Sequence, residues 1–265
     1  MKNGNNHPVL RVKRATMAGI ELPQVCFGTE HITQASPEFG GALLAEAMRI
    51  HGVNFWDTDN SYGSITQVSA ALKMVRRDEV VVSSKSYAST TSETRNDIKR
   101  TLAQLDTDYV DMFLLHEVKA GKLKDLMPSL GVIMEAKKAG LIRAVGLSTH
   151  SVQIFNDAAE VDGIEFLCAP LNMEGSRIEE GTLDGMLKAM DKAHNKCNKG
   201  VYVIKTLGAG DYIYKLKDAL EWVVQFKDRI DVFNIGVVSL AEMRENLEIL
   251  SKHIPMDTGE VVSDL

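Results

Sequence analysis

The chain has 265 residues, of which 45% are hydrophobic and 25% are charged, fractions typical of a soluble globular protein. Its formal net charge of -6 argues against a broad nucleic-acid-binding surface, which needs basic residues gathered on one face. We therefore expect small-molecule chemistry. The three cysteines are far apart and form no C-x-x-C pair, which predicts neither a disulfide framework nor an iron-sulfur cluster and favours the cytoplasm.

The two ends of the chain are polar, and neither resembles a targeting or membrane segment. Residues 1–8 are expected to be a flexible N-terminus, and residues 252–265 a frayed polar tail. No apolar run approaches the length of a membrane span, so we expect a cytoplasmic protein without a membrane partner. Residues 9–14 and 20–22 flank a short turn at 17–19, which predicts a hairpin that closes one end of a barrel.

Between these ends, eight short apolar segments alternate with longer segments of helical spacing. The strand candidates are residues 24–28, 54–56, 79–83, 109–115, 142–147, 165–169, 200–204 and 232–235. Several helical segments begin with a capping signal, at Ser36, at Thr91 with Glu93, at Ser151 and at Ser239 with Glu242. Eight strand-helix units predict one α/β domain over residues 9–251, a (β/α)8 or TIM barrel. A doubly wound open sheet is the main alternative, but no Gly-x-Gly-x-x-Gly follows the first strand.

Four ionisable residues fall at the carboxyl ends of three successive predicted strands, where a barrel of this kind carries its chemistry. The second strand ends in Asp57 with Tyr62 in the following loop, the third ends in Lys85, and the fourth ends in His116. Each alone has an ordinary structural explanation, such as a helix cap, a packing aromatic, a solvated lysine or a histidine bonded to a carbonyl. Their joint placement favours an active site.

Two other patterns are assigned no chemistry. Asp111 lies inside the apolar fourth strand and is expected to be a buried acid bonded to the backbone. His194 and Cys197 are close in sequence, but no third or fourth ligand lies near them. We therefore predict no metal site.

The segments GVNFWDTDNSYG, VVVSSK and YVDMFLLH, in this order and spacing, resemble those of the aldo-keto reductase superfamily. The likeness continues in LIRAVGLSTH, VIKTLGAG and IGVVSLAEMRENLEIL and covers nearly all of residues 20–250. It implies a catalytic tetrad of Asp57, Tyr62, Lys85 and His116 that reduces a small aldehyde or ketone with NADP(H) or NAD(H). The chain looks like a short member, near a branch in which some proteins carry a C-terminal iron-sulfur extension. No cysteine follows Cys197, so we expect none here.

The tetrad makes physical sense for carbonyl reduction, which needs a proton on oxygen as well as a hydride on carbon. A phenol is a reluctant acid at neutral pH, and we expect the Lys85 ammonium to lower the pKa of Tyr62 so that this residue acts as general acid. Asp57 would hold Lys85 charged, because an unpaired buried ammonium is costly. His116 would orient the substrate carbonyl.

The loops after the last two strands are the expected cofactor site. Barrels often bind phosphate there, and small residues with a helix N-terminus suit a pyrophosphate, which points to Lys205, Thr206, Gly208, Gly210 and Ser239. Gly208 and Gly210 could equally form an ordinary turn. The resemblance implies that Ser148 bonds the nicotinamide amide and that Glu245 and Asn246 meet the adenine. The predicted set is completed by Gly28, Thr29, Asp57 and Leu207.

The chain also departs from the family pattern. Glu242 aligns with the arginine that commonly reads the 2'-phosphate, so no preference between NADPH and NADH is predicted. The loops that cover the cofactor and shape the substrate pocket in larger members are short or missing. Two alternatives follow: a Schiff-base barrel of the aldolase type that uses Lys205, or a non-catalytic barrel that binds a nucleotide or a partner. Substrate identity and oligomeric state are not predicted.

Overall fold

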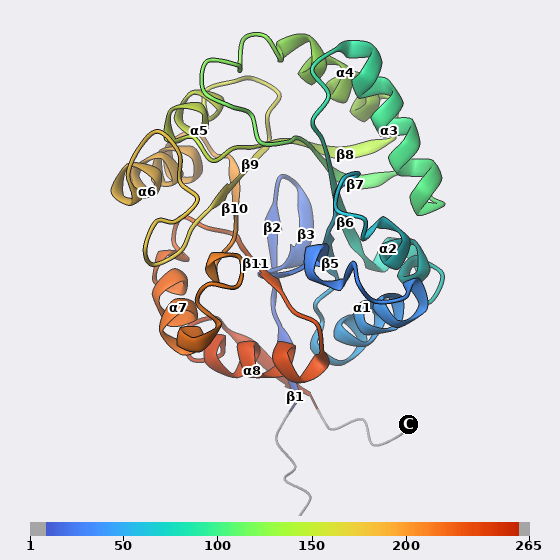
Figure 1. The fold of residues 1–265 in the computed structure, drawn as a ribbon, viewed down its shortest axis with the longest axis vertical. Helices are drawn as coiled ribbons and strands as arrows, with labels where there is room; N and C mark the ends of the chain where they lie inside the picture. Colours follow the sequence, from blue (N-terminus) through green and yellow to red (C-terminus); the bar gives the residue numbers. More distant parts are fainter. Residues whose placement is uncertain (1–8, 260–265) are drawn as a thin grey trace, which may run out of the picture.

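The computed structural model describes residues 9–259, and eight parallel strands close into a barrel within this range. The strands follow one another in space in the order β10-β11-β4-β5-β6-β7-β8-β9, and the helices form a ring around them (Figure 1). The predicted (β/α)8 barrel is therefore confirmed. The expectation for residues 1–8 and for the end of the chain after residue 259 lies outside the described residues.

All eight predicted strand segments are barrel strands, with ends that differ by a few residues. The strands are β4 (Val25–Gly28), β5 (Phe55–Asp57), β6 (Val81–Ser86), β7 (Val110–Leu115), β8 (Ile142–Ser148), β9 (Phe166–Pro170), β10 (Gly200–Ile204) and β11 (Val232–Gly236). The helices are α1 (Pro37–His51), α2 (Ile65–Leu72), α3 (Thr91–Leu105), α4 (Met127–Lys138), α5 (Val152–Ala158), α6 (Leu183–Asp191), α7 (Leu216–Val223) and α8 (Leu240–Leu250).

The predicted helix starts are close to the observed ones. Ser36, Ser151 and Ser239 are N-caps whose hydroxyls accept backbone hydrogen bonds, as expected. The start of α3 differs, because the cap is Thr90 and not Thr91. The Thr90 side chain accepts from the Glu93 backbone, and the Glu93 carboxylate accepts from the Thr90 N–H, which completes a capping box.

Side chains alternate along each strand between the barrel interior and the helix layer, and this alternation determines which side chains reach the candidate site. On β5, Phe55 belongs to the interior cluster, whereas Trp56 belongs to the cluster under the helices. On β7, Met112 and Leu114 belong to the interior cluster and Phe113 to the outer one. Successive residues of a strand point to opposite faces, so every second residue enters the interior.

The hairpin of β2 (Arg14–Met17) and β3 (Ile20–Pro23) closes the amino end of the barrel, as predicted. Its two-residue turn has both residues in the left-handed region, Ala18 at φ 53° and Gly19 at φ 73°, which matches the twist of a tight hairpin. Met17, Ile20 and Leu22 are buried in the interior cluster. The hairpin therefore acts as an apolar plug.

Residues 9–14, expected to form one arm of the hairpin, are divided between two strands, because β1 (Val9–Val12) pairs with a different strand. Its partner is β12 (Met256–Gly259), which lies in the tail that we expected to be frayed. A pairing between the two ends of the chain has no local sequence signal, and this explains the difference. None of the helices within residues 9–259 combines the length and apolar character that crossing a membrane requires.

Candidate active site

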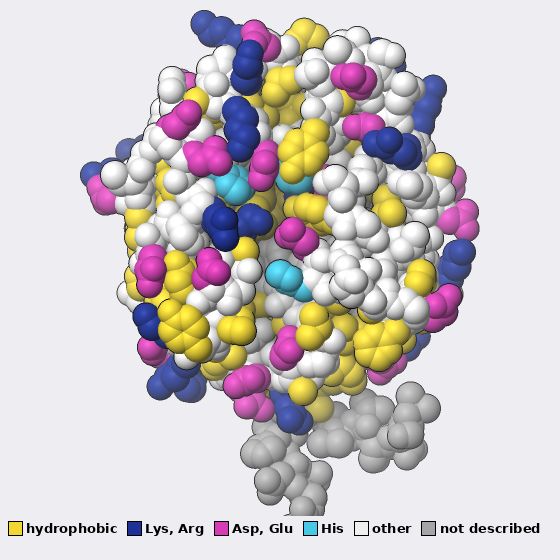
Figure 2. All heavy atoms as spheres, in the orientation of Figure 1, with side chains coloured by type: hydrophobic (Ala, Val, Ile, Leu, Met, Phe, Trp, Pro, Cys, Tyr) yellow, Lys and Arg dark blue, Asp and Glu magenta, His cyan; other side chains and the backbone are white. Residues whose placement is uncertain are grey.

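The alternation of side chains brings the predicted tetrad into the carboxyl end of the barrel. Asp57 follows Phe55 by two residues, Lys85 follows Val81 by four, and His116 follows Leu114 by two, so all three point the same way as interior residues. All three are buried. Figure 2 shows the face of the molecule above them, where a hollow near the centre is bordered by His, acidic and basic side chains.

Asp57 and Lys85 form a buried ion pair. The Lys85 Nζ donates to Asp57 Oδ1 at 2.7 Å and to the Thr58 carbonyl at 2.9 Å, and Lys85 has no exposed surface. Burial alone would lower the pKa of Lys85, but the surrounding acidic groups, Asp57 foremost, together outweigh burial and the pKa is raised. The ammonium therefore stays charged, as its predicted role requires.

Two further side chains hold the Asp57 carboxylate, and sequence reasoning missed both. Asn234 Nδ2 donates to Oδ2 at 2.9 Å, and the Tyr202 hydroxyl donates to Oδ1 at 3.4 Å. Asn234 lies two residues after Val232, which belongs to the interior cluster, and Tyr202 belongs to that cluster itself. The sequence contained a signal for both residues, because each is a polar residue of an apolar strand at a position that faces the barrel interior.

Tyr62 lies beside this ion pair. The Lys85 Nζ is 4.9 Å from the centroid of the Tyr62 ring. Burial raises the pKa of Tyr62 and outweighs the lowering by Lys85, because Asp57 neutralises much of that charge and itself raises the pKa. Lys85 lowers the pKa of Tyr62 as expected, but the expectation of a net lowered pKa is wrong. The phenol is neutral.

His116 is held by a carboxylate that sequence reasoning did not single out. Its Nδ1 lies 2.7 Å from Asp59 Oδ2, and both side chains are buried. The ring of Tyr87 stacks on His116 at 4.2 Å between centroids, and Tyr62 meets it edge-on at 5.9 Å. Asp59 lies in GVNFWDTDNSYG, two residues after Asp57, but only the folded loop brings it to His116.

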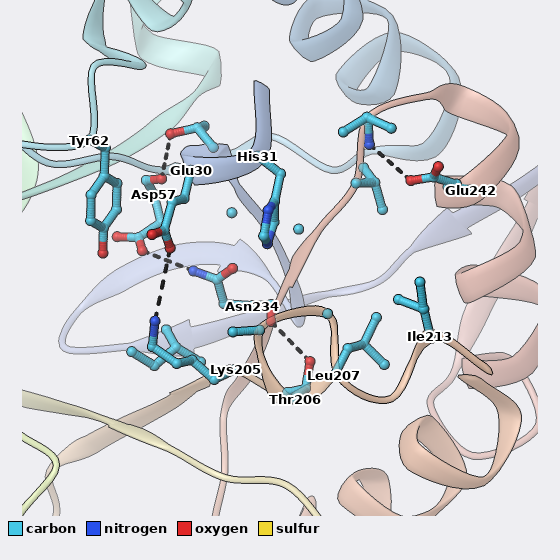
Figure 3. A pocket seen from close by; sticks show the side chains of 18 residues that line it. Glu30, His31, Asp57, Tyr62, Lys205, Thr206, Leu207, Ile213, Asn234 and Glu242 are labelled. Carbon is cyan, nitrogen blue, oxygen red and sulfur yellow. Dashed lines mark hydrogen bonds and ion pairs between the residues drawn. The ribbon is translucent and has the colours of Figure 1, made fainter. Parts of the chain in front are cut away.

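A cavity of about 280 Å³ opens from Tyr62 and Asp57 and extends to Val238 and Glu242, at the start of α8 (Figure 3). Eight predicted site residues line it: Gly28, Thr29, Asp57, Tyr62, Lys205, Thr206, Leu207 and Gly210. It is also lined by residues that were not predicted to bind cofactor, among them Glu30, His31, Asn234 and Glu242. The structure thus brings the two ends of the predicted site into one groove.

The other predicted site residues do not line this cavity: Lys85, His116, Ser148, Gly208, Ser239, Glu245 and Asn246. Ser148 is buried and its hydroxyl accepts from the Glu117 N–H at 2.9 Å. Asn246 is buried within α8, whereas Glu245 is exposed on the same helix. The cofactor contacts assigned to Ser148, Glu245 and Asn246 stay predictions.

The loop from Lys205 to Gly210 forms one wall of the cavity. Lys205, Gly208, Ala209 and Gly210 all have left-handed φ values, and the Cβ position of Gly210 has no neighbouring atom within 4 Å. Across the groove, Lys205 Nζ lies 3.9 Å from Glu30 Oε2 (Figure 3). The Lys205 side chain is 23% exposed. A Schiff-base lysine is activated by desolvation or by a neighbouring cation, whereas Lys205 is partly exposed and faces a carboxylate, so this environment does not favour the aldolase alternative.

Glu242 occupies the far end of the groove. Its carboxylate accepts from the Val238 N–H at 2.9 Å, and its own N–H donates to the Ser239 hydroxyl at 3.2 Å. Glu242 is exposed and brings a negative charge to the cavity wall. An anion bound at this end would meet the Glu242 carboxylate, whereas an anion bound near Lys205 would meet an ammonium group.

The remaining candidates have structural partners. Asp111 accepts from the Val82 N–H at 2.9 Å, which confirms the backbone bond that we expected, and it also pairs with Arg77 and Arg143. His194 pairs with Asp231 at 3.2 Å. In the part of the chain that the structure describes, no His, Cys, Asp and Glu side chains gather in a group of three or more that could hold a metal ion.

Comparisons with known proteins agree with this geometry. Residues 24–215 match the family model "Aldo/keto reductase family". Aldo-keto reductase family 4 member C11 of Arabidopsis thaliana is 30% identical over 162 residues, which cover 54% of this chain and 50% of that protein. Methylglyoxal reductase DkgB of Salmonella typhi is 28% identical over 115 residues, which cover 42% of this chain and 43% of that one. The matched part thus spans about half the length of these curated relatives.

Solved structures match over a larger share of the chain. A putative aldo-keto reductase from Pseudomonas aeruginosa superposes with a TM-score of 0.78 at 21% identity, covering 94% of this chain and 98% of that one. A thermostable aldo-keto reductase, solved with the inhibitor epalrestat, has a TM-score of 0.73 at 23% identity and is covered over 94% of its chain, against 90% of this one. At these identities the likeness establishes the fold.

Proposed function

Because the chain belongs to the aldo/keto reductase family, we propose that it is an NAD(P)H-dependent oxidoreductase that reduces an aldehyde or ketone to an alcohol, with Tyr62 as the general acid. The observation that carries the proposal is the buried Asp57–Lys85 pair, with Nζ and Oδ1 2.7 Å apart, directly beside Tyr62 at one end of an elongated cavity. The substrate is a small carbonyl compound.

The groove has the chemistry that a nicotinamide dinucleotide needs. Lys205 offers a cation, Thr206 a hydroxyl, and Gly210 a backbone with open space before it, so these three residues would hold the phosphates. Family members bind NAD(P)H, and these residues fit that group. When bound, the reduced nicotinamide supplies the hydride, with its two electrons, to the carbonyl carbon.

Tyr62 supplies the proton. The phenol is protonated at neutral pH, as a proton donor must be, although burial raises its pKa and makes it a weaker acid. The O–H bond of Tyr62 breaks as the O–H bond of the alcohol forms, and the phenolate left behind is stabilised by the Lys85 ammonium, 4.9 Å from the ring centroid. A proton from water then restores the phenol.

Lys85 can do this because Asp57 keeps it charged and in place. The Asp57 carboxylate is in turn fixed by Asn234 and by the weaker bond from Tyr202. Charge is thus arranged before the substrate arrives, so little reorganisation is needed during proton transfer. His116 lies against Tyr62, where its ring can bond the same carbonyl oxygen.

The test is the Tyr62→Phe variant, measured for nucleotide binding and for turnover separately. Fluorescence of the two tryptophans reports the Kd of NADH and NADPH, and cofactor absorbance reports hydride transfer with a panel of small carbonyls. Loss of the acid is expected to lower turnover by at least about 10²-fold, with Kd changed by only a few-fold. Tyr109→Phe is the matched control, because Tyr109 packs under Arg77 at the amino end of the barrel.

The outcomes separate the alternatives. Normal turnover of Tyr62→Phe contradicts the acid assignment, and absence of nucleotide binding in the wild-type protein contradicts the oxidoreductase assignment. Nucleotide binding without turnover of any carbonyl indicates a non-catalytic nucleotide-binding barrel. Borohydride trapping of a carbonyl adduct on Lys205 indicates the Schiff-base alternative.

A further inference from the structure

Asp59 contacts one ring nitrogen of His116. Asp59 Oδ2 lies 2.7 Å from Nδ1, and the side chains are 1% and 3% exposed. Among residues 9–259, the Nε2 atom has no hydrogen-bond partner. One nitrogen of the ring is therefore committed to a carboxylate, and the other is free for a ligand.

Resting on the proposed function of the site, we propose that Asp59 is a positioning residue that fixes the tautomer of His116. A carboxylate can only accept, so the Nδ1 atom must carry a hydrogen in both the neutral and the charged ring. The nitrogen whose protonation changes is then Nε2. The charged ring donates from Nε2, and the neutral ring accepts there.

The charged and the neutral state of His116 match the substrate and the product of the reaction, respectively. A carbonyl oxygen only accepts, so it pairs with the charged ring, whose Nε2–H donates. An alcohol hydroxyl can donate, so it pairs with the neutral ring, whose Nε2 accepts. Asp59 thereby makes substrate recognition by His116 depend on protonation, with carbonyl binding favoured at low pH.

The titratable groups that face the ring are Asp59, Tyr62 and Tyr87. Burial would raise the pKa of Asp59, but the hydrogen bond and charge of His116, with Lys85 nearby, lower it overall. Tyr87 stacks on the ring, and burial with the carboxylates of Glu117 and Asp59 raises its pKa to about 12. Tyr62 is also neutral. The carboxylate of Asp59 is therefore the charge in contact with the ring.

Asp59 also has a structural role, which the Asn variant preserves. Its Oδ1 accepts from the Ser61 N–H at 2.5 Å and from the Ser61 hydroxyl, which shapes the loop. In Asp59→Asn, the amide oxygen is needed by the Ser61 N–H, so the amide nitrogen faces Nδ1 and donates to it. The neutral His116 ring must then carry its hydrogen on Nε2, the opposite tautomer.

The first test reads the tautomer directly and needs no activity. In protein labelled with nitrogen-15, a long-range proton–nitrogen spectrum shows which ring nitrogen carries hydrogen, and His116→Gln identifies the His116 signals among the seven histidines. The neutral wild-type ring is expected to carry it on Nδ1, and the Asp59→Asn ring on Nε2. A wild-type ring protonated on Nε2 overturns the proposal, and this result does not require Asp59→Asn to fold.

The second test follows KM and kcat for a small carbonyl against pH. The KM of the wild type is expected to rise with pH, because loss of the hydrogen on Nε2 removes the donor to the carbonyl oxygen. In Asp59→Asn the donor is neutral throughout, so kcat/KM at low pH falls by about tenfold and KM becomes independent of pH. The control Ser61→Ala keeps the backbone bond to Asp59, and its tautomer and pH profile should match the wild type.

A double mutant completes the design. If Asp59 acts through His116, then Asp59→Asn with His116→Gln is no worse than His116→Gln alone. Additive losses with an unchanged tautomer contradict the proposal. Failure of the proposed function can be distinguished from failure of this proposal. If the wild type shows no hydride transfer, the proposed function fails, but the measured tautomer of His116 is unaffected.

Discussion

Buried carboxylates lie at both ends of the barrel, and they are satisfied in different ways. At the amino end, Asp111 of β7 pairs with Arg143 at 2.6 Å and Arg77 at 2.8 Å, and the arginine side chains are 47% and 19% exposed. At the carboxyl end, Asp57 pairs with Lys85, which has no exposed surface. The partners of Asp111 reach water, and the partner of Asp57 does not.

This difference separates a structural acid from one for which we propose a role in catalysis. If Asp111 is removed, its arginines can turn towards solvent, so the cost is a matter of stability. If either member of the Asp57–Lys85 pair is removed, the other is left as an unpaired charge in a dry interior beside Tyr62. In TIM barrels generally, the amino end supports stability and the carboxyl end carries the chemistry.

The largest effect is expected for Lys85→Met, which keeps the length of the side chain and removes its charge. Removal of one partner of a buried pair costs about 3–5 kcal/mol in the free energy of unfolding, and turnover should be lost with it. Denaturant unfolding and single-turnover hydride transfer measure the two losses. Lys205→Met is the control for stability, because its contact with Glu30 is 3.9 Å long and partly exposed, worth less than about 1 kcal/mol.

The same prediction has a defined pH range. The folded pKa of Lys85 is raised, so the stabilisation by the pair is fully present below the unfolded pKa of about 10.4 and is lost as pH rises through the folded value. The cost of Lys85→Met should therefore be constant across neutral pH. A cost that disappears at neutral pH would contradict a charged pair.

At the amino end, Asp111→Asn is expected to change stability and leave catalysis intact. Loss of its charge should lower the free energy of unfolding by about 1–3 kcal/mol, because the Val82 N–H bond and two arginine bonds are weakened. Since Asp111 has no contact with the tetrad, kcat and KM should equal those of the wild type. A fall in kcat beyond the error of the assay would break the distinction between the two ends.

A finer comparison concerns the two side chains that hold Asp57. Asn234 bonds Oδ2 at 2.9 Å and Tyr202 bonds Oδ1 at the longer distance of 3.4 Å. Hydrogen bonds to charged groups contribute more than neutral ones, so Asn234→Ala should lower kcat by about tenfold. Tyr202→Phe keeps the ring and should cost clearly less. Equal losses of kcat would show that hydrogen-bond length does not determine which of these two side chains contributes more.

Regular patterns predicted the barrel and the placement of Asp57, Tyr62, Lys85 and His116 at its carboxyl end, because both depend on strand ends and on the two-residue alternation. The same alternation contains Asn234 and Tyr202, which a closer count of interior positions would have found. The pairing of Asp59 with His116 was out of reach, since the residues are 57 positions apart and meet only through the loop after β5. The pairing of β1 with β12 lacked a signal for the same reason. The pKa of Tyr62 depends on burial, which composition does not report.

The smallest effect is expected for Glu242, an exposed carboxylate at the far end of the groove from Tyr62. If the nicotinamide binds at Tyr62, as proposed, the adenosine half would reach this end, and a 2'-phosphate would meet a negative charge there. We expect NADH to bind more tightly than NADPH. Because the site is exposed and screened, Glu242→Gln should change the ratio of the two Kd values by only about 2- to 5-fold.

The measurement is a pair of fluorescence titrations at low and at high salt. The shift for Glu242→Gln should shrink as salt rises, and Glu242→Arg should favour NADPH further, because a guanidinium pairs with phosphate. Glu248→Gln is the matched control, since Glu248 is exposed on the same helix and faces Arg244. An unchanged ratio in Glu242→Arg would mean that the adenosine half lies elsewhere, and the assignment of the groove to the whole dinucleotide would then fail.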